Sequence, residues 1–283
     1  MEVTIALIKD LREKTGAGMA DCKLALTESQ GDMQKAIEFL RKKGAAMASK
    51  RADKIAKEGA VKSSISEDKK TGVIIEINCE TDFVSKGDGF QNFAQSVADA
   101  ALASGSDDVT KILESKAKDN LSVQEIIDGM MGSVGEKIEF KRAKLIHIAD
   151  GFVSSYIHFG SKVGAIIGMK GSYSPEADDI GNKIAMQTVA MSPISVKRGE
   201  IPAEIIEKEK EIYREQCKNE KKPDHIIEKI VGNKVEKYFQ ENCLMEQEYI
   251  QDASKSIGDL LKEYSQKTGS ELDAVKMFRF QLG

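Results

Sequence analysis

The stretch Thr71–Lys86, TGVIIEINCETDFVSK, joins a β-branched apolar run to a short polar segment that carries one large aromatic residue. Residues 71–77 have the composition of a buried or half-buried strand, and the Gly-Asp-Gly sequence at 87–89 breaks the chain before a helix. Residues Thr81–Val84 are therefore expected on a strand-to-helix connection. Phe83 either packs into the core beneath this connection or projects as a binding wedge. Because binding residues concentrate on loops held by rigid scaffolds, this junction is the best candidate for a working surface.

Composition indicates a soluble, folded protein. A chain of 283 residues is long enough for two or three compact units, and 41% hydrophobic with 31% charged residues is ordinary for a globular protein. We find neither an apolar run of about 18 residues nor a secretory leader, so we expect a cytoplasmic location and no membrane partner. The four cysteines are widely spaced and form no Cys-x-x-Cys pair, so we predict reduced structural thiols: Cys22, Cys79, Cys217 and Cys243.

Local charge raises an alternative function. The net charge of −4 gives no general drive toward nucleic acid. The segment 41–57, however, contains seven basic residues against the single acid Asp53; they are Arg41, Lys42, Lys43, Lys50, Arg51, Lys54 and Lys57. A solvated helix face explains this cluster, and an RNA-binding module that uses residues 41–57 is the alternative. The interleaved aromatic residues that single-strand platforms need are absent from the segment.

Hydrophobic periodicity predicts a fold of the α+β class. Ile5, Leu7, Ile8 and Leu11 recur at helical spacing, and breaks near residues 15–18, 31 and 44 divide the first 44 residues into three short helices. Residues 45–51 are expected to form a solvated linker helix. The sequence after residue 58 predicts two α/β units, followed by an antiparallel helical hairpin that turns at Pro223. A helix and a half-exposed edge strand at 275–280 are expected at the C-terminal end.

These patterns predict six segments along the chain. They are a three-helix domain (1–44), a linker helix (45–58), a core N-subdomain (59–136), a core C-subdomain (137–200), a helical hairpin arm (201–250) and a return to the core (251–283). The strand at 137–148 is placed in the second of the two α/β units.

The chain contains little that predicts covalent chemistry. Its three histidines, His147, His158 and His225, lie outside metal-spaced and nucleophile motifs. Cys79 with His158 is the one pairing that a cysteine enzyme could use. A P-loop and a complete Gly-x-Gly-x-x-Gly are both missing, so we expect no direct nucleotide binding, no metal and no cofactor. We therefore predict a protein that is not an enzyme and that acts on another protein.

Two strings resemble signatures of the bacterial elongation factor Ts family. The first is Glu76–Lys86, which matches the internal signature of that family without a departure that we can identify. The second is Leu11–Leu26, which resembles the opening helix-turn-helix, except that Leu24 stands where the family usually has a basic or polar residue. The resemblance covers nearly the whole chain, including Ser155–Gly160 and Leu244–Ile250.

The resemblance implies a guanine-nucleotide exchange factor for elongation factor Tu. It implies an N-terminal bundle similar to ubiquitin-associated domains, a two-subdomain core and a coiled-coil arm. It also implies that four residues contact the partner and dislodge the magnesium ion that holds its GDP: Thr81, Asp82, Phe83 and Val84. Contact with the partner's nucleotide-binding domain is implied for Leu11, Arg12, Met19 and Lys23, with helix packing as the alternative for Leu11 and Met19.

The same family resemblance implies that Tyr156 and His158 face the partner's C-terminal region. By strand periodicity these two side chains share one face just before Gly160. Nucleic acid is not expected as the primary partner. Whether one heterodimer or a pair of heterodimers is the active assembly stays open at this stage.

Overall fold

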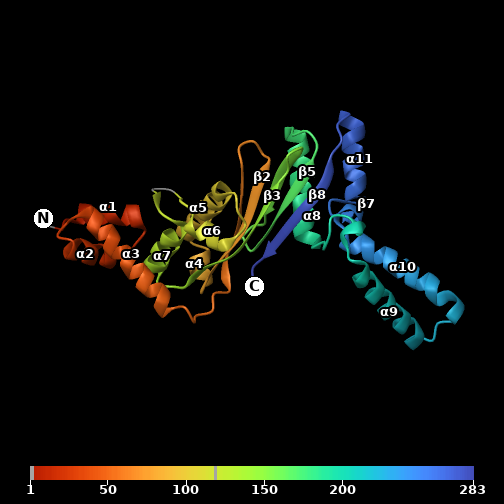
Figure 1. Cartoon of the computed structure of the whole chain (residues 1–283), viewed down its shortest axis with the longest axis horizontal. Helices are drawn as coiled ribbons and strands as arrows, with labels where there is room; N and C mark the ends of the chain where they lie inside the picture. The colour runs from red at the N-terminus through yellow and green to blue at the C-terminus, as the bar shows by residue number, and fades with distance from the viewer. Residues whose placement is uncertain (1–2, 118–119) are drawn as a thin grey trace.

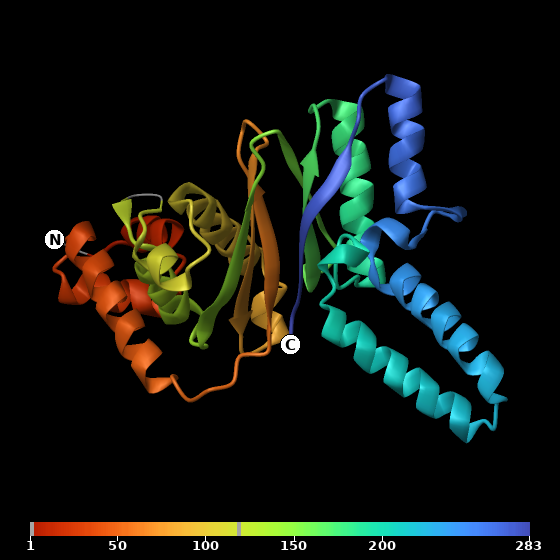
Figure 2. The same ribbon diagram turned by 45° about the vertical axis from the view of Figure 1, so that its right-hand side comes forward.

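The computed structural model describes residues 3–117 and 120–283. At its centre, two three-stranded antiparallel sheets pack face to face, and helices cover the outer side of each sheet (Figures 1 and 2). The first sheet has the order β1-β2-β3 and the second has the order β4-β5-β8. Their bounds are β1 Glu58–Ile65, β2 Thr71–Cys79, β3 Ile138–His147, β4 Gly151–Ile157, β5 Val163–Lys170 and β8 Asp273–Gln281.

The central position of β2 explains its apolar sequence. Every residue of β2 after Thr71 is buried, because successive side chains of a strand point to opposite faces and both faces are covered. Val73, Ile75 and Ile77 pack against the outer helices. Ile74 instead faces the second sheet. The predicted buried strand is confirmed, and it ends at the junction that carries Phe83.

One buried carboxylate lies between the two sheets, and its partner Arg142 contacts the second sheet. Glu76 is fully buried between them and accepts from Arg142 Nε at 2.6 Å and from Lys141 Nζ at 3.1 Å. A register shift in the β2–β3 pairing follows Glu76. The Arg142 guanidinium lies 4.2 Å from the ring centroid of Phe280 on β8. A buried charge is tolerated only when it is paired in this way.

The sequence predicts the strand at 137–148 in the second α/β unit, but β3 pairs with β2 in the first sheet. The order of elements along the chain does not specify which sheet receives a strand. Here α7 (Val123–Val134) lies on the first sheet and returns the chain to the free edge of β2. The chain crosses to the second sheet only between β3 and β4. The predicted edge strand near the C-terminus is confirmed as β8, at the edge of the second sheet.

The outer helices pack through separate apolar clusters. α5, α6 and α7 cover the first sheet, and α8 and α11 cover the second (Figure 2). A small two-stranded sheet, β6-β7, lies beside α11. The bounds of these remaining core elements are α4 Asp82–Ser85, α5 Asp88–Ser104, α6 Val109–Glu114, α8 Pro175–Met191, β6 Glu248–Tyr249, β7 Asp252–Ser256 and α11 Ile257–Thr268.

Three helices at the N-terminus pack around their own small cluster at one end of the molecule (Figure 1). They are α1 Ile5–Thr15, α2 Met19–Glu28 and α3 Met33–Lys50. The expected helix end at Gly44 and the separate linker helix after it are wrong, because α3 continues to Lys50. Gly44 lies where α3 crosses α7, and a Cβ there would be 2.2 Å from the Asp128 carbonyl oxygen. Glycine therefore permits a close helix crossing here and does not end the helix.

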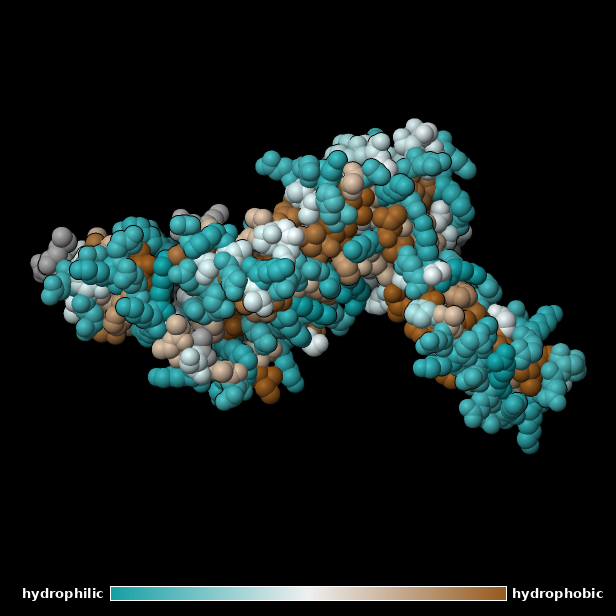
Figure 3. Space-filling model, in the orientation of Figure 1, coloured by the Kyte–Doolittle hydropathy of each residue, from teal (hydrophilic) through white to brown (hydrophobic). Residues whose placement is uncertain are grey.

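Two further helices project from the opposite end of the core (Figures 1 and 2). α9 (Ala203–Asn219) and α10 (Asp224–Asn242) pack through a cluster that includes Cys217, Ile227, Val231 and Val235. Pro223 precedes α10, as the sequence predicts. The outward surface of this arm is mostly hydrophilic (Figure 3). Over the two stretches 3–117 and 120–283, none of the helices is both long and apolar enough to span a bilayer.

Candidate functional site

Phe83 lies on α4, a single helical turn directly after β2. Thr81 begins this turn with an extended backbone, and its Oγ1 accepts from the Val84 amide at 3.4 Å. The Phe83 side chain is 88% exposed, while Val84 packs against the cluster on the first sheet. The interpretation of Phe83 as a core residue is therefore wrong. The turn presents one large apolar side chain to solvent and anchors itself with the next residue.

Glu136, which the sequence did not single out, fastens the start of α4. Its Oε2 accepts from the Thr81 amide at 3.0 Å, and its Oε1 accepts from Thr81 Oγ1 at 2.7 Å. The neighbouring Glu80 Oε1 accepts from the Lys137 amide and from Arg51 Nη1, each at 2.6 Å. Two carboxylates thus connect the end of β2 to the start of β3. These hydrogen bonds fix the backbone at the start of α4.

We expect Glu136→Ala to loosen α4. The half-buried Thr81 would lose the acceptor of both its amide and its hydroxyl proton, at a cost of about 1–3 kcal/mol in unfolding free energy. Amide exchange at Val84, Ser85 and Lys86 should accelerate. Denaturant unfolding and hydrogen exchange measure these effects.

The matched control is Glu139→Ala, which removes an exposed carboxylate that lies 3.9 Å from Lys137 Nζ. It should change the unfolding free energy by less than about 0.5 kcal/mol. Equal stability of the Glu136 and Glu139 variants would remove Glu136 as the anchor of α4.

Asp82 is presented as a carboxylate at neutral pH. Its Oδ2 lies 2.6 Å from Lys86 Nζ, four residues on. The hydrogen bond from Lys86 is the main reason that the pKa of Asp82 is lowered. A cation that approaches Asp82 must compete with this ammonium group.

The N-terminal residues divide between the bundle core and its surface. Leu11 is fully buried in the three-helix cluster, so the structure assigns it to packing and not to a contact surface. Arg12, Met19 and Lys23 are exposed. Leu24 is exposed too, and α2 runs through it unbroken, as expected. The turn after α1 has Gly16 at φ 68°, with its amide donating to the Arg12 carbonyl at 2.8 Å.

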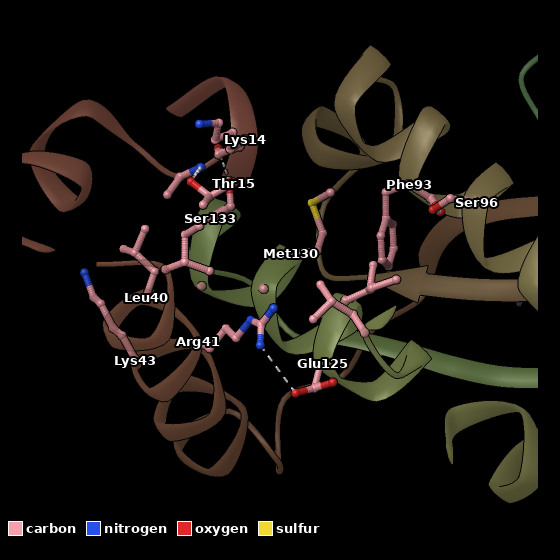
Figure 4. A pocket seen from close by; sticks show the side chains of 17 residues that line it. Lys14, Thr15, Leu40, Arg41, Lys43, Phe93, Ser96, Glu125, Met130 and Ser133 are labelled. Carbon is pink, nitrogen blue, oxygen red and sulfur yellow. Dashed lines mark hydrogen bonds and ion pairs between the residues drawn. The ribbon is translucent and has the colours of Figure 1, made fainter. Parts of the chain in front are cut away.

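A cleft of about 250 Å³ separates this bundle from the helices of the core (Figure 4). Leu40 lines it from α3, and Phe93 and Met130 line it from α5 and α7. Arg41 and Glu125 approach across it, with Nη1 and Oε1 3.6 Å apart. Ser133 Oγ donates to the Gly16 carbonyl. The turn after α1 is thereby attached to the core, although it is remote from it in sequence.

Tyr156 and His158 meet at the end of β4. The Tyr156 hydroxyl lies 3.0 Å from His158 Nδ1, which confirms that the two side chains share a face. Tyr156 is half-buried against the outer cluster of the second sheet, and His158 is exposed. The β4–β5 turn that follows is bonded to β1 through the Val61 amide and the Ser161 carbonyl, 2.7 Å apart. α4 and this turn therefore occupy the same end of the paired sheets.

Comparison with known proteins decides the family. A sequence model of the family described as "Elongation factor TS" matches residues 80–283. The chain is 48% identical over 279 residues to "Elongation factor Ts" of Prosthecochloris aestuarii, covering 98% of this chain and 97% of that relative. It is 42% identical over 282 residues to the protein of the same name from Clostridium perfringens, with coverage of 99% and 93%.

The chain belongs to the elongation factor Ts family. It is therefore a translation elongation factor by family, as the two signature strings indicated. The matched family region begins immediately before Thr81 and includes Tyr156 and His158. The bundle that carries Arg12, Met19 and Lys23 lies outside that region but within the alignments to the full-length relatives.

Two alternative functions lose support in a protein of the elongation factor Ts family with this geometry. Burial, together with the nearby Glu136 charge, raises the pKa of Cys79 to about 12, so its thiol stays protonated at neutral pH. Cys79 Sγ donates to the Thr81 carbonyl at 3.2 Å, while His158 pairs with Tyr156. A cysteine enzyme is therefore disfavoured.

In the basic segment, three of the seven cations form ion pairs within the protein. Arg41 pairs with Glu125, and Lys43 Nζ lies 2.5 Å from Asp21. Arg51 pairs with Glu80 beside α4. Three of the seven positive charges therefore have structural partners, which weakens the RNA-binding alternative.

Proposed function

We propose that this chain binds elongation factor Tu in its GDP form and accelerates the release of GDP, so that GTP can reload. The observation that carries the proposal is Phe83, an aromatic side chain held 88% exposed on a fastened turn, in a chain of the elongation factor Ts family. Aromatic side chains are enriched where proteins bind one another, so an exposed phenylalanine on a fastened turn suits contact with a partner.

The mechanism requires no covalent chemistry. An exchange factor binds the nucleotide-free partner more tightly than the GDP-bound partner, and by linkage it weakens GDP binding by the same factor. Each tenfold acceleration of release needs about 1.4 kcal/mol of preferential stabilisation on the route to the open state. Burial of one phenylalanine contributes about 1.5–3 kcal/mol, so one wedge matters and several contacts must add.

In this proposal, α4 acts on the partner's magnesium clamp. Magnesium bridges the phosphate oxygens of GDP to the protein that binds it, so displacing its ligands weakens the nucleotide without any contact to the base. Phe83 would displace partner side chains around the ion, with Asp82 adjacent. Thr81 and Val84 would hold the turn, a role that the Glu136 contacts and the packing of Val84 support.

The other surfaces would orient the partner. The ubiquitin-associated-like bundle at 1–44 would dock on the nucleotide-binding domain through Arg12, Met19 and Lys23. Tyr156 and His158 would face the partner's C-terminal region. The two paired sheets with their outer helices would form the core, and α9 and α10 would form a coiled-coil arm. The protein would act in the cytoplasm, as a heterodimer with elongation factor Tu or as a pair of heterodimers.

The deciding experiment mixes this protein with elongation factor Tu that is loaded with fluorescent GDP, in excess unlabelled GDP. Release should accelerate by at least 100-fold at saturation, equivalent to about 2.7 kcal/mol of preferential stabilisation. A release rate that does not depend on the concentration of this protein would refute the proposal.

A further inference from the structure

A second aromatic tip lies at the same end of the sheets as Phe83. Phe159, in the turn between β4 and β5, is 97% exposed. Phe159 and Phe83 are the two most exposed large hydrophobic side chains in the part of the chain that the structure describes. The family resemblance drew attention to Tyr156 and His158, but it gave no role to Phe159.

The turn that carries Phe159 is held from several sides. The Ser161 amide donates to the His158 carbonyl at 2.9 Å, and Gly160 and Ser161 take left-handed conformations with φ 83° and 56°. Lys162 Nζ lies 2.9 Å from Glu58 Oε2 on β1. The Leu282 amide donates to the Lys162 carbonyl at 2.9 Å. The backbone of this turn is therefore already ordered, and a partner that covers Phe159 restricts mainly the rotamers of its side chain.

Gln91 connects the two tips through its side-chain amide. Its Nε2 donates to the carbonyl of Ser85, the last residue of α4, at 2.6 Å. Its Oε1 accepts from Ser161 Oγ, in the turn that carries Phe159, at 3.1 Å. Gln91 belongs to the first turns of α5, which packs on the first sheet. The half-buried side chain of Gln91 thus contacts both α4, which carries Phe83, and the β4–β5 turn, which carries Phe159.

We infer that Phe159 is a second anchor for the same partner and that Gln91 is a positioning residue that sets the spacing of the two aromatic tips. This inference rests on the proposed function, and the occupant is elongation factor Tu. Both tips are rigid, both belong to one end of the molecule and one hydrogen-bonded bridge joins them. A surface of this kind suits a single rigid partner better than two separate partners, because both apolar side chains can then be covered in one docking event.

The two aromatic residues have different expected kinetic signatures. Phe159→Ala should raise the factor concentration that gives half-maximal GDP release by about tenfold, because one large apolar side chain is no longer buried on docking. The maximal rate should stay within about twofold. Phe159→Leu should recover most of the loss. Since Phe159 is almost entirely exposed, these variants keep the fold, which their thermal unfolding midpoints check.

Gln91 is tested in two backgrounds. Gln91→Ala should raise the half-saturating concentration when Phe159 is present and should have little further effect in the Phe159→Ala protein. A purely structural loss would act equally in both backgrounds. The matched control is Ile250→Ala, in the β6–β7 turn, which removes a 41% exposed apolar side chain on the helix-covered side of the second sheet. It should leave the half-saturating concentration unchanged.

The outcomes separate the inference from the function. If the unaltered protein does not accelerate release, the proposed function fails. If it does, but Phe159→Ala has the same half-saturating concentration, the anchor is refuted while the function stands. A Phe159→Ala protein that loses maximal rate at unchanged half-saturation would also overturn the anchor role. Equal effects of Gln91→Ala in both backgrounds would refute the positioning role.

Discussion

Replacing Phe83 with alanine is expected to lower the maximal rate of GDP release from elongation factor Tu by about 10- to 100-fold, which corresponds to about 1.5–3 kcal/mol of apolar burial. The free protein should lose almost nothing, because this side chain is 88% exposed and so contributes little to the core. The entire effect should therefore appear in the complex. Stopped-flow measurement of fluorescent GDP release at saturating factor concentration gives the rate directly.

The control for this prediction keeps the apolar bulk. Phe83→Leu should stay within a few-fold of the unaltered protein, because most of the buried area is retained. Thermal unfolding midpoints of both variants should match that of the unaltered protein. A folded Phe83→Ala protein that releases GDP as fast as the unaltered one would remove Phe83 from the mechanism.

Local pattern predicted the strand and the turn that carry Phe83, but not what supports them. The β-branched run of β2 and the helix breaker after it are formed by residues close together in the chain, so a single sequence is enough to predict them. Glu136 lies 55 residues beyond Thr81, and nothing in its neighbourhood indicates that its carboxylate meets that backbone amide. Gln91 is hidden for the same reason. A side chain that joins two remote loops leaves no periodic signal.

The prediction of which sheet contains β3 was wrong for a related reason. Its apolar residues predicted a strand correctly, yet pairing depends on which edge is free when the chain returns from α7. Leu11 shows the reverse case, because its helical periodicity already favoured packing and the family signature suggested contact. The structure buries it completely. Periodicity was therefore the better guide to the burial of Leu11.

The structural role of Gly44 was the hardest to predict from sequence. Its substitution is expected to have the largest structural effect. Gly44→Ala should lower the unfolding free energy by about 1–3 kcal/mol, even though alanine favours an isolated helix over glycine by about 1 kcal/mol. The added Cβ would lie 2.2 Å from the Asp128 carbonyl oxygen and 2.9 Å from its carbonyl carbon. Backbone atoms cannot rotate away, so α3 must move off α7.

That movement should release the N-terminal bundle from the core. The Ser133–Gly16 hydrogen bond and the Arg41–Glu125 ion pair depend on the same crossing, and both should be lost. Small-angle scattering should then report a larger radius of gyration, and denaturant unfolding should report the lost stability. The half-saturating concentration for GDP release should rise as well, because the docking surface that we propose on the bundle would no longer be fixed relative to α4.

Gly129→Ala is the matched control, since Gly129 lies on the facing helix α7 and a Cβ there would meet no atom within 4 Å. It should be neutral or stabilising by about 0.4–1 kcal/mol, through loss of flexibility in the unfolded chain. The two substitutions make the same chemical change on two helices that touch, so helix propensity cancels in the comparison and only the close approach remains. A Gly44→Ala protein as stable as the Gly129→Ala protein would show that the crossing can widen without cost.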